Sequence, residues 1–281
     1  MKSAYQKDEA LLADIGQARS DGATKIWWLG QSGFLVVTPA GTILFDPYLS
    51  DSLTNKYAGT DKPHVRITEP VIDPARLTGI DVITSSHNHT DHLDAATLLP
   101  LFEANPQAKL VCPRANRSEI LARLGAVEER LVEMNAGETT EVAGIRIHGI
   151  SAAHNTAERD GEGKCKFMGF VAQLAGHTFY FSGDTLLHDG LLDLLQGFEP
   201  DVAFLPINGN KPERRVAGNL NGEEAAALGK QIGAKIVVPH HFDMFEFNTA
   251  DPSLLEAACK EQGQTCRTLR NGEGLVVSSV T

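Results

Sequence analysis

The run Ser-His-Asn-His-Thr-Asp-His-Leu-Asp at residues 86–94 places three histidines and an aspartate within six positions. Imidazole nitrogens and carboxylate oxygens are the ligands that suit a borderline divalent ion such as zinc. The run directly follows residues 80–84, an apolar stretch that is typical of a β-strand. Because side chains alternate along an extended segment, His87 and His89 point to the same side and can bind one ion.

Asp91 and His92 follow where the chain turns toward a predicted helix. They therefore face a different point in space from His87 and His89, which indicates two adjacent metal positions rather than one. A polar, histidine-rich surface loop is the alternative interpretation. We consider it the weaker one, because four such ligands within six residues seldom arise by chance.

Further ligand candidates each stand just beyond another strand-like segment. They are His154 after residues 145–150, Asp184 at the end of residues 179–184, and the pair His240 and His241 after residues 236–239. Polar residues at the carboxyl ends of several strands can converge on one rim of a sheet, the usual position of an active site in layered α/β folds. The sequence therefore contains enough ligands for two ions.

Taken in order, these residues resemble the signature of the metallo-β-lactamase superfamily of metal-dependent hydrolases: His-x-His-x-Asp-His, then a distant His, an Asp and a His. The resemblance extends from about Ile26 to about Phe247. It implies an α/β fold, a four-layer αββα sandwich in which helices flank two mixed β-sheets. It also implies a first metal bound by His87, His89 and His154, a second bound by Asp91, His92 and His241, and Asp184 bridging the two.

The adjacent pair His240 and His241 leaves a choice of ligand. The family motif, Pro-x-His, aligns His241 with the metal ligand and leaves His240 as its neighbour. A strand turns alternate side chains to opposite faces, so only one of the two should reach the metals. We favour His241, with His240 as the alternative.

Leu93 and Asp94, directly after the Asp-His pair, resemble the branch that contains L-ascorbate-6-phosphate lactonase and the N-acylphosphatidylethanolamine phospholipase. Residues 27–33, 182–185 and 234–245 resemble segments of the lactonase. The loop 206–215 keeps the glycine and proline of that lactonase but shifts its basic residue, and the chain is shorter at its C-terminus. These differences from the lactonase affect the prediction of the substrate but not that of the reaction class.

The resemblance implies a hydrolase in which a metal-bridged hydroxide opens a small anionic lactone or ester. Two divalent ions would be the cofactors, with zinc or manganese expected and iron compatible. Asp91 would be both a ligand and the catalytic proton carrier. The alternatives are a phosphodiesterase or phospholipase-like hydrolase and a non-catalytic metal-binding protein. A flavin–di-iron redox protein is disfavoured, because the chain has no appended flavin domain and keeps His92.

Substrate contacts are harder to predict than metal ligands. A cationic loop could bind an anionic substrate, although a solvated charged loop fits the same residues equally well. Residues 48–74, which lack periodicity, either border the pocket or form a plain connector. Asp94 and Asp243 are candidates for holding the ligating histidines, and Asp94 is equally suited to cap a helix. The substrate-binding candidates are Asn208, Lys211, Arg214 and His188.

The composition of the chain limits the kinds of molecule that it is expected to bind. Lys and Arg number 25 against 36 Asp and Glu, a net charge of −11 that disfavours nucleic-acid binding. No apolar run reaches the ~20 residues of a membrane span, and the polar N-terminus lacks a signal peptide. The four cysteines show no C-x-x-C spacing, so we expect unpaired thiols and a cytoplasmic protein. We expect a small-molecule substrate, and the sequence is compatible with a homo-oligomer.

The local patterns predict one domain over residues 1–281, with an N-terminal helix and a catalytic core from about residue 25. Strands are predicted at 25–29, 33–38, 42–45, 81–84, 109–112, 145–150, 167–174, 177–181, 202–205, 235–238 and 274–278. Helices are predicted at 7–19, 94–102, 117–124, 190–196, 222–232 and 252–262. Asn221 with Glu224 predicts a capping pair, Asp251 with Pro252 a helix start, and Ala175–Gly176 a hairpin turn.

Overall fold

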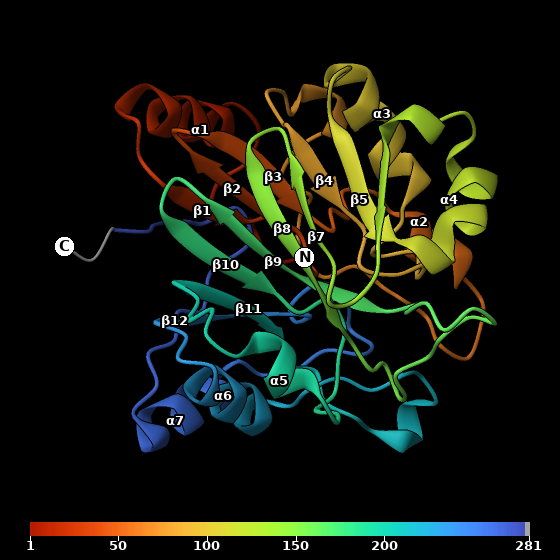
Figure 1. Cartoon of the computed structure of the whole chain (residues 1–281), viewed down its shortest axis with the longest axis vertical. Coiled ribbons are helices and arrows are strands. Elements are labelled where there is room, and N and C mark those ends of the chain that lie inside the picture. Colours follow the sequence, from red (N-terminus) through yellow and green to blue (C-terminus); the bar gives the residue numbers. More distant parts are fainter. Residues whose placement is uncertain (279–281) are drawn as a thin grey trace.

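The computed structural model describes residues 1–278, which form two mixed β-sheets packed face to face with helices on both outer sides (Figure 1). The first sheet has the order β13-β1-β2-β3-β4-β5-β6, and its strands are β1 (Lys25–Trp28), β2 (Phe34–Thr38), β3 (Gly41–Phe45), β4 (Val82–Thr84), β5 (Lys109–Pro113), β6 (Leu131–Met134) and β13 (Gly274–Val276). The second has the order β12-β11-β10-β9-β8-β7, and its strands are β7 (Thr139–Val142), β8 (Ile145–Ser151), β9 (Met168–Leu174), β10 (His177–Phe181), β11 (Val202–Pro206) and β12 (Ile236–His240). The predicted αββα layering is confirmed.

Helices cover both outer faces. They are α1 (Asp8–Asp21), α2 (Ser52–Lys56), α3 (Ala95–Ala104), α4 (Arg117–Leu124), α5 (Leu191–Leu195), α6 (Gly222–Gln231) and α7 (Ser253–Gln262). In Figure 1, α1 and α3 lie at the top, beside the first sheet, and α6 and α7 lie at the bottom, beside the second. Among residues 1–278, no helix is long and apolar enough to cross a membrane.

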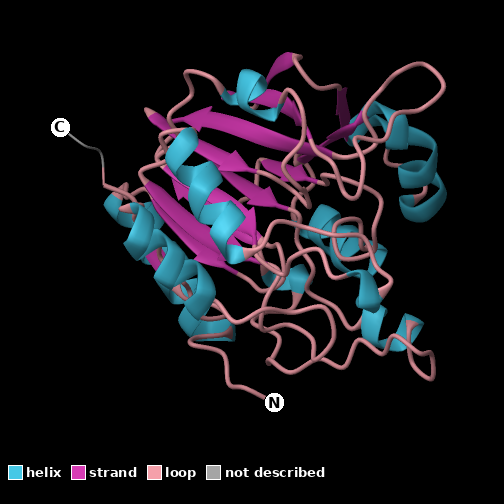
Figure 2. Cartoon of the chain, turned by 90° about the horizontal axis from the view of Figure 1, so that it is seen from below, coloured by secondary structure: helices cyan, strands magenta, loops and turns pink. Residues whose placement is uncertain are grey.

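Strand direction determines where the loops gather. In the first sheet, β3, β4, β5 and β6 are parallel neighbours. In the second, β10, β11 and β12 are parallel, and β8 runs the same way because β9 is antiparallel to both β8 and β10. The carboxyl ends of β8, β10 and β12 therefore share one edge. Figure 2 shows the loops gathered at one end of the sheets.

Side chains alternate between the two faces of each strand, so the first sheet contributes to two separate core layers. In β1, Ile26 and Trp28 face the core between the sheets, while Trp27 packs under the helices of the first sheet. From α1, Leu11 and Ile15 pack into that outer layer. The two tryptophans are therefore core residues, as their position at a strand end indicates.

The predicted elements lie close to the observed ones, with a few instructive differences. The Ala175–Gly176 turn is confirmed, and both residues have positive φ (50° and 76°), as a tight hairpin turn requires. The Asn221–Glu224 capping box of α6 is confirmed. The start of α7 was predicted one residue early: Pro252 is its N-cap, and Asp251 accepts the Ser253 N–H.

Two strands and one helix were not predicted. The strands β6 and β7 are the edges of their sheets and carry mostly half-buried or exposed residues. Polar edge strands lack the apolar alternation that reveals a strand in sequence. The helix α2 has five residues, too few for a helical period to be visible.

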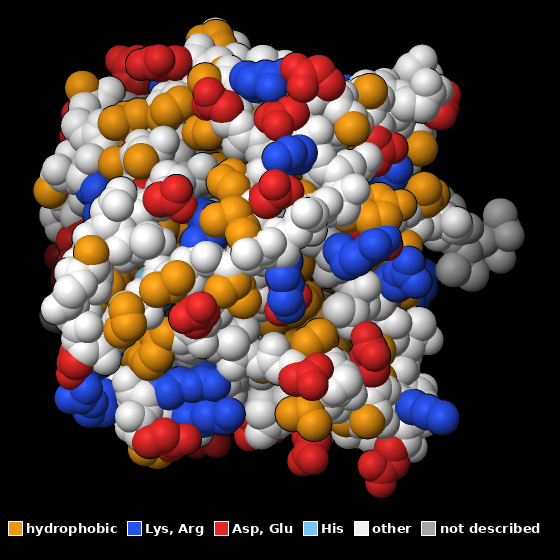
Figure 3. All heavy atoms as spheres, turned by 180° about the vertical axis from the view of Figure 1, so that it is seen from behind, with side chains coloured by type: hydrophobic (Ala, Val, Ile, Leu, Met, Phe, Trp, Pro, Cys, Tyr) orange, Lys and Arg blue, Asp and Glu red, His pale blue; other side chains and the backbone are white. Residues whose placement is uncertain are grey.

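On the face shown in Figure 3, acidic and basic side chains are interspersed rather than gathered into one patch. All four cysteines are free thiols, as expected.

Candidate metal centre

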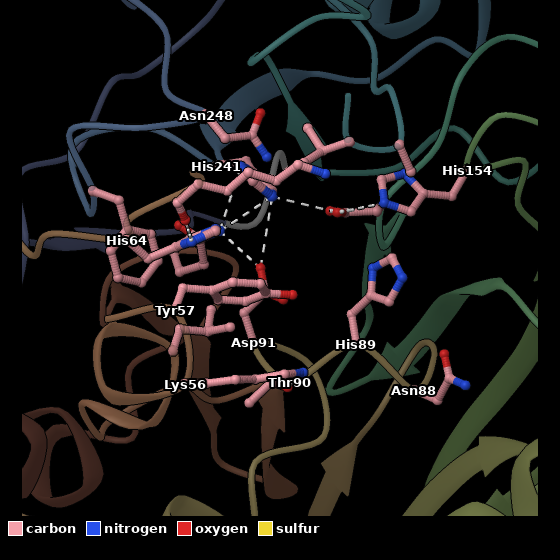
Figure 4. Close-up of a pocket in the computed structure, with 17 residues that line it drawn as sticks. Lys56, Tyr57, His64, Asn88, His89, Thr90, Asp91, His154, His241 and Asn248 are labelled. Carbon is pink, nitrogen blue, oxygen red and sulfur yellow. Dashed lines mark hydrogen bonds and ion pairs between the residues drawn. The ribbon is translucent and has the colours of Figure 1, made fainter. Parts of the chain in front are cut away.

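The predicted ligands come from four loops and lie together at one end of the sheets. His87, His89, Asp91 and His92 lie between β4 and α3, His154 follows β8, Asp184 follows β10, and His241 follows β12. Among residues 1–278, three groups of three have ligand atoms within 4.8 Å of one another. Two of them consist of predicted ligands alone: a first group of His87, His89 and His154, and a second group of Asp91, His92 and His241. The third combines Asp46 with His87 and His92. Figure 4 shows four of these side chains converging: His89, Asp91, His154 and His241.

Asp184 lies between the two groups. Its Oδ2 is 3.6 Å from His154 Nε2 and 3.4 Å from His241 Nε2, and its Oδ1 is 3.4 Å from His92 Nε2. One carboxylate thus reaches histidines of both groups, the geometry that a bridging ligand needs. The residue before it, Gly183, has φ +60°, and an added Cβ would lie 2.7 Å from Ser86 Cβ. Only glycine lets this turn pack against the metal loop.

Unpaired buried atoms test whether these residues fit metal ions. Among residues 1–278, His87 Nε2, His92 Nε2 and Asp184 Oδ1 are buried and have no hydrogen-bond partner. Buried polar atoms are normally paired, because leaving one unpaired costs about 1–3 kcal/mol. Nitrogen and carboxylate lone pairs that converge without a donor fit a divalent cation. The donor set is therefore suitable for metal binding.

The adjacent residues His240 and His241 have different surroundings. His241 has φ +64° and lies in the second group of ligands. His240 is fully buried, its Nδ1 lies 3.0 Å from Ser32 Oγ, and its ring stacks on Phe181. His240 belongs to neither ligand group.

Atoms behind the ligands fix the histidine tautomers. His92 Nδ1 donates to Asp46 Oδ2 over 2.7 Å, and His154 Nδ1 donates to Gly218 O over 2.9 Å. Both rings therefore present Nε2 to the site. Asp46 also accepts the Ser86 N–H and the Thr84 hydroxyl, so its oxygens are occupied and it positions His92 rather than joining the ligands.

Asp94 and Asp243 do not hold the ligating histidines, and that prediction was wrong. Asp94 occupies the N-cap position of α3, and its Oδ2 accepts the hydroxyls of Ser50 and Thr97 over 2.6 and 2.5 Å. Asp243 pairs with Lys2 at the surface. The helix-cap alternative for Asp94 describes its position better.

Burial and charge give the two groups different electrostatics. Burial lowers the pKa of His87 well below its ordinary value and lowers the pKa of His89 to about 4. Burial also opposes the charged form of His92, but the carboxylates of Asp184 and Asp91 outweigh it and raise its pKa well above the ordinary value. The first group therefore offers neutral imidazoles, while the second pairs its histidines with carboxylates.

Gln31 is a site residue that the sequence did not reveal. Its Nε2 donates to Asp91 Oδ2 over 2.9 Å and lies 3.1 Å from His241 Nε2. Its carbonyl accepts the His241 N–H, and its φ is +48°. Positive φ in a non-glycine residue is costly and gathers at functional sites. A glutamine in a turn carries no sequence signal for this role.

A cavity of about 420 Å³ opens in front of the ligands (Figure 4). Its lining residues come from the metal loops, the segment 48–74 and two later loops: Gln31, Leu53, Lys56, Tyr57, Lys62, His64, Asn88, His89, Thr90, Asp91, His154, Asp184, Val216, Ala217, His241, Phe245 and Asn248. The segment 48–74 therefore borders the cavity rather than serving as a plain connector.

The four predicted substrate contacts lie outside this lining, and they are Asn208, Lys211, Arg214 and His188. Asn208 is buried behind the wall, and Lys211 is exposed to solvent. Arg214 donates to backbone carbonyls of the same wall, including Thr249 O. His188 contacts Ser151 O through Nε2 over 3.0 Å.

The family described as "Beta-lactamase superfamily domain" matches residues 42–242, well over half of the chain. The chain therefore belongs to this family. The matched range contains the six residues of the first and second groups and also Asp184.

Two relatives match along most of their length. A protein named metal-dependent hydrolase from Myxococcus xanthus is 26% identical over 259 residues, which cover 90% of this chain and 82% of the relative. Another of that name, from Rubrobacter xylanophilus, is 27% identical over 248 residues, covering 86% of this chain and 91% of the relative.

Solved structures share the fold. Igni18, a metallo hydrolase from Ignicoccus hospitalis, superposes with a TM-score of 0.67 at 22% identity, covering 92% of this chain and 100% of that one. An isothiocyanate hydrolase from Delia radicum gut bacteria superposes with a TM-score of 0.68 at 17% identity, covering 91% and 100%. At such identities the likeness concerns the fold alone.

Proposed function

We propose that this chain is a dinuclear metal-dependent hydrolase that opens a small anionic lactone or ester. The observation that carries the proposal is the pair of ligand groups, joined by Asp184, at the cavity floor. The relatives named metal-dependent hydrolases support the reaction class. When bound, two divalent ions supply an activated water and stabilise negative charge that develops on oxygen.

The proposed ligands follow from the two groups, with Asp184 shared. The first ion would be held by His87, His89 and His154, and the second by Asp91, His92 and His241. Imidazole with carboxylate suits zinc or manganese, and iron is compatible.

Asp91 is the proposed proton carrier. It lines the cavity, and Gln31 fixes its Oδ2 by a hydrogen bond. Burial tends to raise the pKa of Asp91, but His92 and His241 outweigh it and lower that pKa. An ionised carboxylate at the cavity floor can accept a proton from the attacking water and deliver it to the leaving oxygen.

Two lysines support an anionic substrate. Lys56 Nζ contacts Thr90 Oγ1 over 3.1 Å, and Lys62 Nζ donates to Arg215 O over 2.5 Å. Neither ammonium is within ion-pair distance of a carboxylate in the described part of the chain. Positive charge that is not tied up in an ion pair beside a cavity, in a chain of net charge −11, favours an anionic ligand.

The test combines metal analysis with a substrate panel. We expect about two metal equivalents per chain and faster turnover of anionic lactones or esters than of neutral analogues or bis-nitrophenyl phosphate. Faster hydrolysis of the phosphodiester would instead indicate a phosphodiesterase, because the same metal site can direct water at phosphorus. A chain that binds no metal after reconstitution would overturn it.

Lysine variants test the anionic part of the proposal separately. Lys56→Met with Lys62→Met should raise KM for an anionic substrate about tenfold, as expected for the loss of a charged contact, and leave a neutral analogue nearly unchanged. Lys230→Met is the matched control, because its Nζ also donates to a carbonyl, Gln262 O, but on the outer helix α6. Equal KM values for the double variant and the control would contradict an anion contact.

A further inference from the structure

Asn248 lines the cavity near His241, and its amide oxygen is already occupied (Figure 4). Oδ1 accepts one hydrogen bond from Asn208 Nδ2 over 2.9 Å and another from Arg214 Nη1 over 3.0 Å. An amide oxygen has two acceptor positions, so both are used. Among residues 1–278, no group accepts a hydrogen bond from Nδ2 of Asn248.

Arg214 makes this orientation unambiguous. A guanidinium only donates, so the Asn248 atom that faces it must be the oxygen, and the amide cannot be reversed. Arg214 is itself fixed, because Nη1 donates to Asn208 O over 2.7 Å and Nη2 to Thr249 O over 2.8 Å. The Asn248 amide group is thus held with its NH2 on the side away from Arg214.

The orientation of Asn248 extends to two further amides. Asn219 Nδ2 donates to Asn208 Oδ1 over 3.0 Å, and both side chains are buried. The three amides are therefore ordered head to tail and end at the cavity. Asn248 also has φ +57°, a left-handed conformation that asparagine tolerates better than most residues and that persists where surrounding bonds hold it.

We propose that Asn248 is a substrate-binding residue whose Nδ2 donates a hydrogen bond to an oxyanion of the substrate, and that Arg214 and Asn208 position it. The inference rests on the proposed function for the presence of such a substrate in the cavity. A carboxylate and a phosphate share this acceptor chemistry. A donor that is oriented before binding loses little freedom when the ligand arrives.

Asn248→Asp is the direct test, because it preserves shape. One carboxylate oxygen still accepts from Asn208 and Arg214, while the cavity-facing NH2 becomes an oxygen that repels an anion. We expect KM for an anionic substrate to rise about tenfold or more, with a smaller fall in kcat, from the loss of a hydrogen bond to a charged group. Gln107→Glu, which likewise replaces an amide by a carboxylate at an exposed position outside the cavity lining, should leave KM unchanged.

Arg214→Met tests the positioning role. It leaves Asn248 in place but removes the donor that prevents the amide from reversing, so KM should rise by a few fold. In a double-mutant cycle, Asn248→Ala should cost less in the Arg214→Met background than in the natural chain. Additive effects on KM, or a lowered Tm with unchanged KM, would indicate a merely structural role and overturn this assignment.

Calorimetric binding of inorganic phosphate and of acetate to the metal-loaded protein separates this inference from the proposed function. In Asn248→Asp, with unchanged metal content, we expect at least one of these oxyanions to bind about tenfold more weakly. The oxyanion that is affected identifies whether Asn248 binds a carboxylate or a phosphate. Equal affinities, or hydrolysis with unchanged KM, would overturn the inference alone. Weakened binding in a chain that hydrolyses no ester would support it and overturn the proposed hydrolase.

Discussion

His92 is held from behind by Asp46, whose Oδ2 lies 2.7 Å from Nδ1. Asp46 directly follows β3, has φ +34° and is fully buried. Its carboxylate also accepts the backbone N–H of Ser86, so one side chain links the first sheet to the beginning of the metal loop. Such a partner sets the tautomer and orientation of a ligating histidine and increases its basicity.

Asp46→Asn should therefore weaken metal binding without removing a ligand. The amide can present only one oxygen, so either His92 or Ser86 loses its acceptor, and we expect metal affinity to fall about 10- to 100-fold. A competition titration against a chromophoric chelator measures the change. Asp94→Asn is the matched control, because Asp94 is equally buried but accepts only from hydroxyls, which can rotate. Equal losses in the two variants would contradict a specific role for Asp46.

At the scale of elements, α4 supports the metal loop from the side. Arg123 Nη1 donates to Asn88 O and to Leu93 O, each over 2.8 Å. These carbonyls lie near the two ends of the segment that carries the histidines. One guanidinium thus bridges the loop and limits its opening.

Arg123→Met should loosen this loop. We expect amide hydrogen exchange in a peptide covering residues 86–94 to become about tenfold faster, because local opening no longer breaks two charge-assisted hydrogen bonds. Exchange in α6 should not change. Arg117→Met is the control on the same helix, since Arg117 pairs with Glu128 and Glu133 and does not contact the loop. A similar acceleration in the control would mean that α4 itself, rather than the Arg123 contact, holds the loop.

The sequence could predict those features whose residues lie close together along the chain. The clustering of candidate ligands between β4 and α3 was predictable because these side chains lie within six residues, directly after the strand that positions them. The roles of Asp46 and Gln31 were not, because these residues reach the site only when the first sheet assembles. Asp46 follows β3, which pairs with β4, and Gln31 lies in the turn between β1 and β2. The edge strands β6 and β7 carry too few buried residues to give an alternating pattern.

The cavity wall shows the same limit. Lys56, Lys62 and Asn248 lie far apart in sequence and meet at one cavity because the segment 48–74 packs on the loop after β12. A small apolar cluster makes that contact, formed by Tyr48, Leu53, Met244 and Phe245. The basic composition of residues 211–215 suggested an anion-binding loop. In the structure, Arg214 instead faces backbone carbonyls and an amide behind the cavity wall.

At the scale of the whole molecule, the metal centre joins the two halves of the sandwich. The loop of residues 87–92 follows the first sheet, whereas His154, Asp184 and His241 follow strands of the second. A continuous apolar core also spans the two sheets, with Phe34 stacked on Phe204 at 4.2 Å between ring centroids. Because the candidate ligands and the core both cross the interface, we expect the chain to unfold as one domain.

Metal removal should therefore lower the stability of the entire chain. A ligand at 100 times its Kd stabilises a folded protein by about 2.7 kcal/mol, and at roughly 2–4 °C per kcal/mol for a domain of this size, chelation should lower Tm by about 5–10 °C. Fluorescence of Trp27 and Trp28 reports on β1, and far-UV circular dichroism reports on both sheets. The two signals should change in one coincident transition, with and without metal. In His154→Ala, which removes a proposed ligand and should keep the fold, added metal should raise Tm by less. Two separate transitions would contradict a single domain, and a Tm that is indifferent to chelation would contradict ions shared between the sheets.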